Sequence, residues 1–184
     1  MSTLEVNTIN PQSGTTITIG GSGDTVSLGS GATQSGFGGV NTPNFGVYGN
    51  GTSVSNGAWT KIVFQNEVYD TDSAFDNSSN YRFTVPSGKG GKYFFNLVIT
   101  PDNGVTFTDW RVQLYKNGSA GGLADGFFSF LSDTKNVSGD FPTITGSCVV
   151  NLNAGDYIEV YGYHTSGASR TFNWPFFQGF RLVE

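Results

Sequence analysis

The sequence predicts an all-β protein, and three features of its composition lead to that class. Glycine occurs 27 times in 184 residues, charged residues make up 12 % and aromatic residues 15 %. Short strands joined by tight turns need glycine and small polar residues, whereas long amphipathic helices need alanine, leucine, glutamate and lysine, which are scarce here. Because the aromatic content is high for one core, we also expect some rings to be buried between subunits.

The alternation of apolar and polar residues places strands along the head, which we assign to residues 45–184. Short alternating runs recur there between turn signals and predict about nine or ten strands, which suits a two-sheet jelly-roll sandwich. The runs are Phe45–Tyr48, Trp59–Phe64, Tyr81–Val85, Tyr93–Thr100, Trp110–Tyr115, Phe127–Leu131, Thr143–Leu152, Tyr157–Tyr163 and Phe177–Val183.

Residues 1–36 have a different character and predict a short N-terminal β-stalk. They contain no aromatic residue, and Thr16–Gly20 recurs nine positions later as Thr25–Gly29. Each copy alternates apolar and hydroxyl side chains, so it has one apolar face that two such units cannot bury alone. Two further copies of the chain would bury it in an intertwined three-stranded stalk, with residues 37–44 as a hinge; a flexible Gly/Ser linker is the alternative. The predicted stalk core is Ile17, Ile19, Val26 and Leu28, and the predicted anchor is Leu4, Val6 and Ile9.

Charge and cysteine usage exclude several classes of function. The net charge is −5 with no basic cluster, so we expect no nucleic-acid partner. No apolar run approaches membrane-spanning length, and the N-terminus lacks the features of a secretory signal, so we expect neither membrane insertion nor secretion. The single cysteine, Cys148, cannot form an intrachain disulfide. We expect the protein to be completed in a reducing cytoplasm.

Five motifs follow one another along the head. They are Phe64, Asp70 and Phe75; Phe83–Pro86 with Gly91–Phe95; Val112–Gly118; Gly146–Leu152 with Gly155–Ile158; and Phe177–Leu182. In this order they resemble the C1q branch of the C1q/TNF-like jelly-roll family. The spacing departs from the family pattern before Phe83 and within Ser87–Gly90, and Leu97 stands where an aromatic residue is usual. The resemblance implies a ten-stranded jelly roll that assembles as a tight homotrimer around aromatic contacts.

The predicted stalk of this chain differs from the collagen stalk of the animal members of that family. No Gly-X-Y run occurs, so the usual collagen stalk is missing. The nine-residue repeat, together with the opening Ser2–Ile9, instead is similar to N-terminal segments of structural proteins from tailed phages of marine and freshwater bacteria. This second resemblance implies a virion appendage.

Catalytic and metal-binding residues are few. His164 is the single histidine, and we expect it at the surface at a strand end; Cys148 alternates with apolar residues, which predicts a buried, inert thiol. We therefore expect no enzyme activity and no cofactor. Asp70, Asp72 and Asp76 are the candidate ligands for a Ca²⁺ ion, which some C1q-like trimers hold near their apex. The alternative, which we favour, is a solvated turn in which these side chains accept local backbone hydrogen bonds.

Consecutive aromatic residues predict surface that must be buried beyond one chain. Such runs point rings to both faces of a strand, and one of those faces lies outside the monomer's own core. The alternative is that exposed rings serve as stacking platforms for sugars or as anchors for a protein receptor. The candidates for the trimer interface are Phe128, Phe130, Trp174, Phe176, Tyr93 and Phe95.

These observations predict a structural protein of a tailed-phage virion, either a short fibre or a capsid decoration spike. Its N-terminus would bind other virion proteins, and its trimeric head would adhere to a host-surface glycan or protein or stabilise the shell. The alternative is a free-standing bacterial C1q-like surface lectin or adhesin.

Overall fold

The computed structural model describes residues 7–32, 41–102, 109–120, 130–132 and 143–182. The chain divides into two units, residues 1–38 and 39–184. Over the described ranges, the search for a helix long and apolar enough to cross a membrane finds none.

Residues 7–32 of the N-terminal unit form no strand, and hydrogen-bonded turns occur at 21–24 and 29–32. Four apolar side chains assigned to a stalk core are exposed in the single chain, with exposed fractions of 40–65 %, and Ile9 is exposed as well. Leu4 and Val6 lie outside the described residues. The β-stalk stays a prediction, since the strands it requires would pair with other copies of the chain. The four exposed residues are Ile17, Ile19, Val26 and Leu28.

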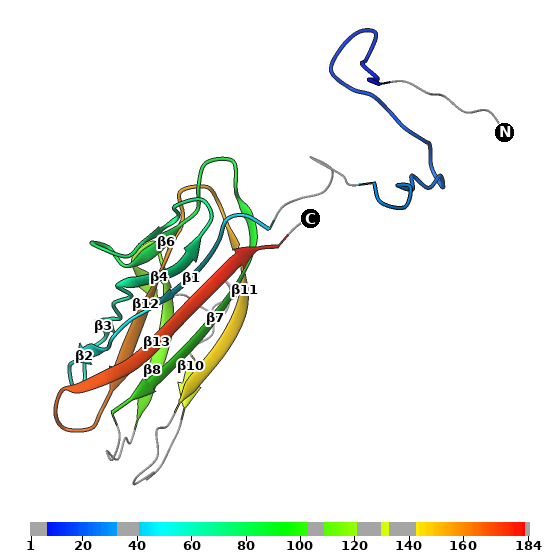
Figure 1. Cartoon of the computed structure of the whole chain (residues 1–184). Helices are drawn as coiled ribbons and strands as arrows, with labels where there is room; N and C mark the ends of the chain where they lie inside the picture. Colours follow the sequence, from blue (N-terminus) through cyan, green and yellow to red (C-terminus); the bar gives the residue numbers. More distant parts are fainter. Residues whose placement is uncertain (1–6, 33–40, 103–108, 121–129, 133–142, 183–184) are drawn as a thin grey trace. The chain divides into compact units, whose positions relative to one another are not determined.

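The second unit is a sandwich of two antiparallel sheets (Figure 1). Sheet A has the order β11 (Ile144–Leu152), β7 (Gly91–Pro101), β13 (Arg170–Arg181), β1 (Asn44–Tyr48), β4 (Asn66–Asp70), and β2 (Thr52–Val54) also pairs with β13. Sheet B has the order β10 (Phe130–Ser132), β8 (Trp110–Lys116), β12 (Tyr157–His164), β6 (Arg82–Thr84), β5 (Phe75–Asp76); β3 (Thr60–Lys61) also pairs with β12 and β9 (Ser119–Ala120) with β8.

The predicted all-β, two-sheet class is confirmed, while the division into strands differs in detail. The described residues form thirteen strand segments rather than about ten, because several edge pairings, such as β3 and β5, are only two residues long. The polar strand β4 was not predicted, since its sequence Asn-Glu-Val-Tyr-Asp lacks an apolar alternation. Strand β13 begins at Arg170, earlier than the predicted Phe177, and continues through Pro175 by means of a register shift between Asn173 and Phe176.

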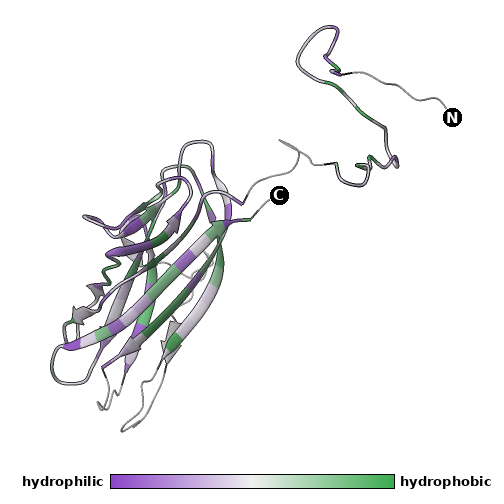
Figure 2. Ribbon diagram, viewed as in Figure 1, coloured by the Kyte–Doolittle hydropathy of each residue, from purple (hydrophilic) through white to green (hydrophobic). Residues whose placement is uncertain are grey.

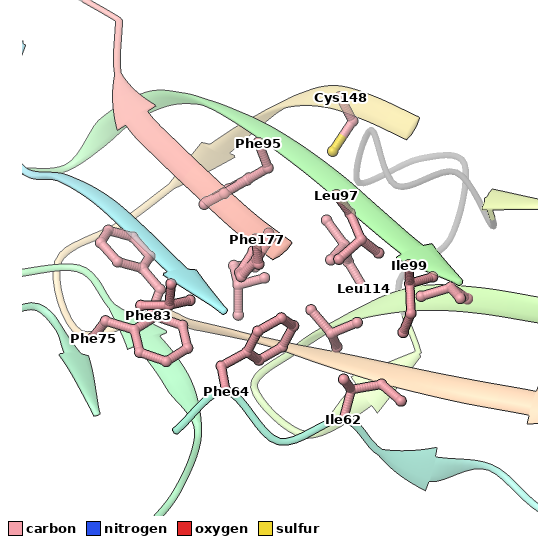
Figure 3. Packing of buried hydrophobic residues seen from close by; sticks show 14 of the residues in the cluster. Ile62, Phe64, Phe75, Phe83, Phe95, Leu97, Ile99, Leu114, Cys148 and Phe177 are labelled. Carbon is pink, nitrogen blue, oxygen red and sulfur yellow. The ribbon is translucent and has the colours of Figure 1, made fainter. Parts of the chain in front are cut away.

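Phenylalanine rings from both sheets fill the space between them (Figure 3). Phe45 of β1 in sheet A stacks on Phe75 and Phe83 of sheet B, with ring centroids 5.2 Å and 4.9 Å away. Phe95 of β7 stacks on Phe177 of β13 at 5.6 Å. Paired rings in these geometries stabilise beyond the area that they bury, so this cluster fixes the spacing of the sheets.

Gly179 of β13 lies directly against two rings of this core. A Cβ atom built there would lie 2.5 Å from Cδ1 of Phe95 and 3.0 Å from Cε1 of Phe45. The glycine therefore makes room for two rings, and any side chain at this position would have to displace them.

His164 corrects one expectation, because its side chain is fully buried rather than at the surface. Its Nε2 donates to the Val54 carbonyl oxygen at 3.0 Å, and its Nδ1 accepts from Ser166, whose Oγ lies 3.0 Å away. The last residue of β12 points into the sandwich because it continues the inward series of Ile158, Val160 and Gly162. The imidazole is thus a structural bridge between β12 and β2.

We predict that Gly179→Ala lowers the free energy of unfolding by about 1–3 kcal/mol, because the new methyl group overpacks the rings of Phe45 and Phe95. Chemical denaturation monitored by circular dichroism measures this change. Gly90→Ala is the matched control in the same unit, since a Cβ atom at Gly90 would lie no closer than 3.5 Å to its neighbours, an ordinary van der Waals distance. Equal stability of the two variants would contradict the packing described for Gly179.

Candidate functional site

The outer face of sheet A carries a patch of half-exposed apolar side chains. Strand alternation turns Phe94 and Val98 outward, because Tyr93, Phe95 and Leu97 point into the core. The patch, called the phenylalanine face below, consists of Phe94 and Val98 of β7, Phe176 and Phe180 of β13 and Val149 of β11. Figure 2 shows the alternation of hydrophilic and hydrophobic residues along β13.

The strand register brings the members of the phenylalanine face together. Phe94 pairs with Phe180 across β7 and β13, and their ring centroids are 5.2 Å apart. Val98 pairs with Phe176 in the same ladder, and Val149 pairs with Phe94 across β11 and β7. The five residues therefore lie on one face of three neighbouring strands, in two apolar rows.

Two amide side chains lie between the apolar rows of this face. Asn96 and Gln178 pair in register, and the Gln178 amide donates to Oδ1 of Asn96 at 3.4 Å. The Asn96 amide in turn donates to the Gly146 carbonyl oxygen at 3.3 Å. Their polar groups are thus partly satisfied within the sheet, which lowers the cost of covering the face with another protein surface.

The predicted interface residues separate into three groups. Phe176 lies on the phenylalanine face, whereas the side chains of Tyr93 and Phe95 are fully buried in the core of one chain. Burial raises the pKa of Tyr93 to about 12, with the nearby Arg181 opposing the shift, and the Tyr93 hydroxyl donates to the Lys89 carbonyl oxygen. Neither ring is available to another chain.

The remaining candidates lie elsewhere. Phe128 is outside the described residues, and of Phe130 only its place in β10 is described. Trp174 is 62 % exposed and occupies the register shift of β13 with a φ of 46°. That left-handed conformation is costly for a bulky residue, and such strain is concentrated at functional positions. The following Pro175 is buried, and its carbonyl oxygen accepts from the Gly49 amide at 2.9 Å.

Sequence reasoning missed Phe94, Phe180 and Val149 as part of this face. The signal was present, because each alternates with a buried residue in a predicted strand. The sequence alone does not tell which side of a strand faces the other sheet and which faces outward when both sides are apolar.

The aspartate cluster forms turns. The Asp76 carboxylate accepts from the backbone amides of Ser78, Ser79 and Asn80 at 2.9–3.1 Å and from the Asn80 side-chain amide at 2.7 Å. These hydrogen bonds, led by that of Ser79, hold the pKa of Asp76 well below its usual value. The carboxylate is therefore engaged in ordering the turn that joins β5 to β6.

Asp70 has a similar part in the preceding turn. Its Oδ2 accepts from the Phe75 amide at 2.7 Å, and its Oδ1 accepts from the Asp72 amide at 3.4 Å. Asp72 accepts from the hydroxyl of Thr71 at 3.0 Å. Within the described part of the chain, no group of three or more histidine, cysteine or acidic side chains is placed to hold a metal ion. The geometry matches the turn that we weighed against a Ca²⁺ site.

Cys148 is buried at the inner face of β11, as predicted. Burial raises the pKa of its thiol to about 11, so the thiolate that a nucleophile requires is disfavoured at neutral pH. His164 is held by Val54 and Ser166 in another part of the core.

Comparisons with known protein sequences find two relatives in Bacillus subtilis (strain 168). No family model matches the sequence. The chain is 28 % identical over 120 residues to the uncharacterized protein YqcC of Bacillus subtilis (strain 168), covering 61 % of this chain and 29 % of YqcC. It is 29 % identical over 104 residues to the phage-like element PBSX protein XkdV of the same organism, covering 56 % of this chain and 15 % of XkdV. The chain thus spans less than a third of the length of either relative.

Solved structures resemble the second unit at low sequence identity. The globular domain of zebrafish complement 1qA superimposes with a TM-score of 0.55 at 18 % identity, covering 77 % of this chain and 98 % of that domain. The PRD1 vertex protein P5 gives a TM-score of 0.54 at 16 % identity, covering 78 % of this chain and 99 % of P5. Murine APRIL at pH 5.0 superimposes with a TM-score of 0.51 at 17 % identity, covering 76 % of this chain and 99 % of APRIL. The chain has a C1q/TNF-like jelly-roll fold, a fold that is typically non-enzymatic, and is distantly homologous to XkdV.

We predict that Asp76→Asn lowers the free energy of unfolding at pH 7 by about 1 kcal/mol, because the turn loses charge-assisted hydrogen bonds. The folded-state pKa of Asp76 is depressed, so its contribution is complete above the unfolded pKa, about 4, and is lost as pH falls below that value. The stability gap between the two proteins should therefore narrow in acid. Denaturation at pH 7, 4 and 2.5 measures it, with Asp72→Asn as the control; a gap that widens in acid would contradict the assignment.

Proposed function

We propose that this protein is a structural protein of a tailed-phage virion, either a short fibre or a capsid decoration spike. The observation that carries the proposal is the combination of a C1q/TNF-like head with sequence similarity to a protein of a phage-like element. Similarity of the fold to the PRD1 vertex protein P5 is consistent with the proposal.

The head assembles as a homotrimer in this proposal, with the phenylalanine face as the surface between chains. Proteins with the C1q/TNF fold typically trimerise, which is consistent with an unpaired apolar face on one sheet. Phenylalanine and valine have no polar group to hydrate, so burying them against another chain is favourable by about 25 cal/mol for each Å² removed from water. Phe176 is then the predicted interface residue whose placement best suits the role.

The N-terminal unit attaches the trimer to the particle. Its apolar residues are exposed in the single chain and require partners, which other copies and other virion proteins would provide. Leu4, Val6 and Ile9 are assigned to the anchor. Three heads on one stalk would gain effective concentration at a host surface, so weak individual sites suffice for adhesion; the same projecting trimer would stabilise a shell.

We predict that the full-length protein has a molar mass of three times 19.6 kDa in solution. The head without residues 1–36 should also be a trimer, and Phe176→Asp in that head, where no stalk holds the chains together, should reduce it to one chain. A carboxylate buried in an apolar interface without a partner is strongly unfavourable. Light scattering coupled to size exclusion measures the mass, and circular dichroism checks that the variant is folded.

The matched control is Val68→Asp, the same chemical change at an exposed residue of the edge strand β4. It should leave the trimer intact. A monomeric wild-type protein would contradict the trimer, and a trimeric Phe176→Asp variant would contradict its assignment to the phenylalanine face.

We predict that removal of residues 1–36 leaves a folded head but abolishes incorporation into particles. Incorporation is measured by sedimenting purified particles and detecting the protein in the pellet, with the full-length chain as the reference. A truncated protein that still sediments with particles would show that the anchor lies in the head.

A further inference from the structure

The outer face of sheet B carries a second patch with a different chemistry. Strand β12 turns Tyr157, Tyr161 and Tyr163 outward, because Ile158, Val160 and His164 are buried. Tyr161 lies in register between Lys61 of β3 and Gln113 of β8. The patch, called the tyrosine face below, consists of Trp59, Tyr115, Tyr157, Tyr161 and Tyr163.

Contacts between the rings hold this face in one arrangement. Tyr115 and Tyr161 are stacked with centroids 4.0 Å apart. Trp59 lies 5.3 Å from Tyr163 and 6.2 Å from Tyr115. All four rings are half-buried, so each keeps part of its surface open to solvent while its neighbours restrict its rotamer. Because the rings are already restricted, binding a ligand on this face costs little side-chain conformational entropy.

Three of the four cations described at this face are paired with carboxylates of the same chain. Lys61 is paired with the buried Glu159, Arg111 with Asp109 at 2.8 Å and Lys116 with Asp156 at 3.2 Å. The Arg82 guanidinium instead lies over the Tyr157 ring, 4.1 Å from its centroid. With these cations compensated, the face complements an uncharged ligand better than an anionic one.

Each tyrosine of the face carries a hydroxyl group, which can donate and accept hydrogen bonds. Burial, reinforced by the neighbouring Tyr161, raises the pKa of Tyr115 above its usual value, so the phenol is neutral over the physiological range. Each ring thus combines an apolar surface with a polar tip. Rings of this kind occur where a contact is partly apolar and partly wet, unlike the phenylalanines of sheet A.

We propose that the tyrosine face binds an uncharged carbohydrate chain. The C–H groups on one side of a pyranose ring carry slight positive charge and pack against the electron-rich face of an aromatic ring. The equatorial hydroxyl groups around its edge then meet the phenol hydroxyls and the indole nitrogen of Trp59. The inference rests on the proposed function, because it names the ligand class of the adhesive head. A trimer would present three such faces.

The test uses the full-length protein on an array of neutral polysaccharides (dextran, mannan, xylan and β-glucan) and acidic ones (polygalacturonate and hyaluronate). We expect retention on at least one neutral polysaccharide that persists at 0.5 M salt, since screening does not weaken stacking. Tyr163→Ala and Trp59→Ala should each weaken it by about tenfold or more, and Tyr163→Phe should keep most of it because the ring remains.

The matched control is Tyr69→Ala, which removes an exposed tyrosine from sheet A and should leave carbohydrate binding unchanged. Thermal melting and light scattering confirm that all variants are folded and share one oligomeric state. Binding to no neutral polysaccharide, binding that Tyr163→Ala and Trp59→Ala leave intact, or binding confined to acidic polysaccharides and abolished by salt would overturn the proposal. So would host-cell binding that protease removes and periodate does not, since the partner would then be a protein.

The two proposals fail separately. A protein that is found on particles but binds no neutral polysaccharide leaves the virion role standing and overturns the carbohydrate site. A protein that binds the polysaccharide through the tyrosine face but is absent from particles supports the carbohydrate site and overturns the virion role.

Discussion

The aromatic packing between the two sheets is the constraint on which the rest of the head depends. Phe45 of sheet A lies against Phe75 and Phe83 of sheet B, and Gly179 leaves the space in which Phe45 and Phe95 meet β13. Because β13 is the strand between β7 and β1, its position sets the register of the whole of sheet A. A change at this point would therefore alter both faces of that sheet.

The fixed register determines which side chains the head shows to its surroundings. In β7 and β13 the apolar residues between the buried positions are phenylalanine and valine, apart from Trp174, and in β12 the residues between the buried positions are tyrosine. The two outer faces consequently differ in whether their rings carry a polar group. An apolar face suits permanent burial against another chain, whereas a face of tyrosine and tryptophan suits a reversible, partly hydrated contact. The two proposals are therefore compatible: sheet A forms the trimer, and sheet B of each chain stays open to bind carbohydrate.

Alternation in the sequence was sufficient to predict the fold class, most strands and the burial of Cys148. It failed where a local pattern was overridden by tertiary context. A proline such as Pro175 usually ends or interrupts a strand, but the register shift beside Trp174 accommodates it within β13. The polarity of His164 predicted a surface residue, yet its hydrogen bonds with Val54 of β2 and with Ser166, which follows β12, satisfy it inside the sandwich. The phenylalanine and tyrosine faces could not be predicted from the sequence, because their residues come together only through the pairing of strands that are distant in the chain.

Hydroxyl-radical footprinting of the intact assembly, read by mass spectrometry, tests the division of roles between the two faces most directly. Compared with the Phe176→Asp variant, Phe94 and Phe180 should be protected from oxidation in the wild-type protein, while Trp59, Tyr161 and Tyr163 should react equally in both. Protection of the tyrosine face, with Phe94 and Phe180 equally reactive in both proteins, would contradict it.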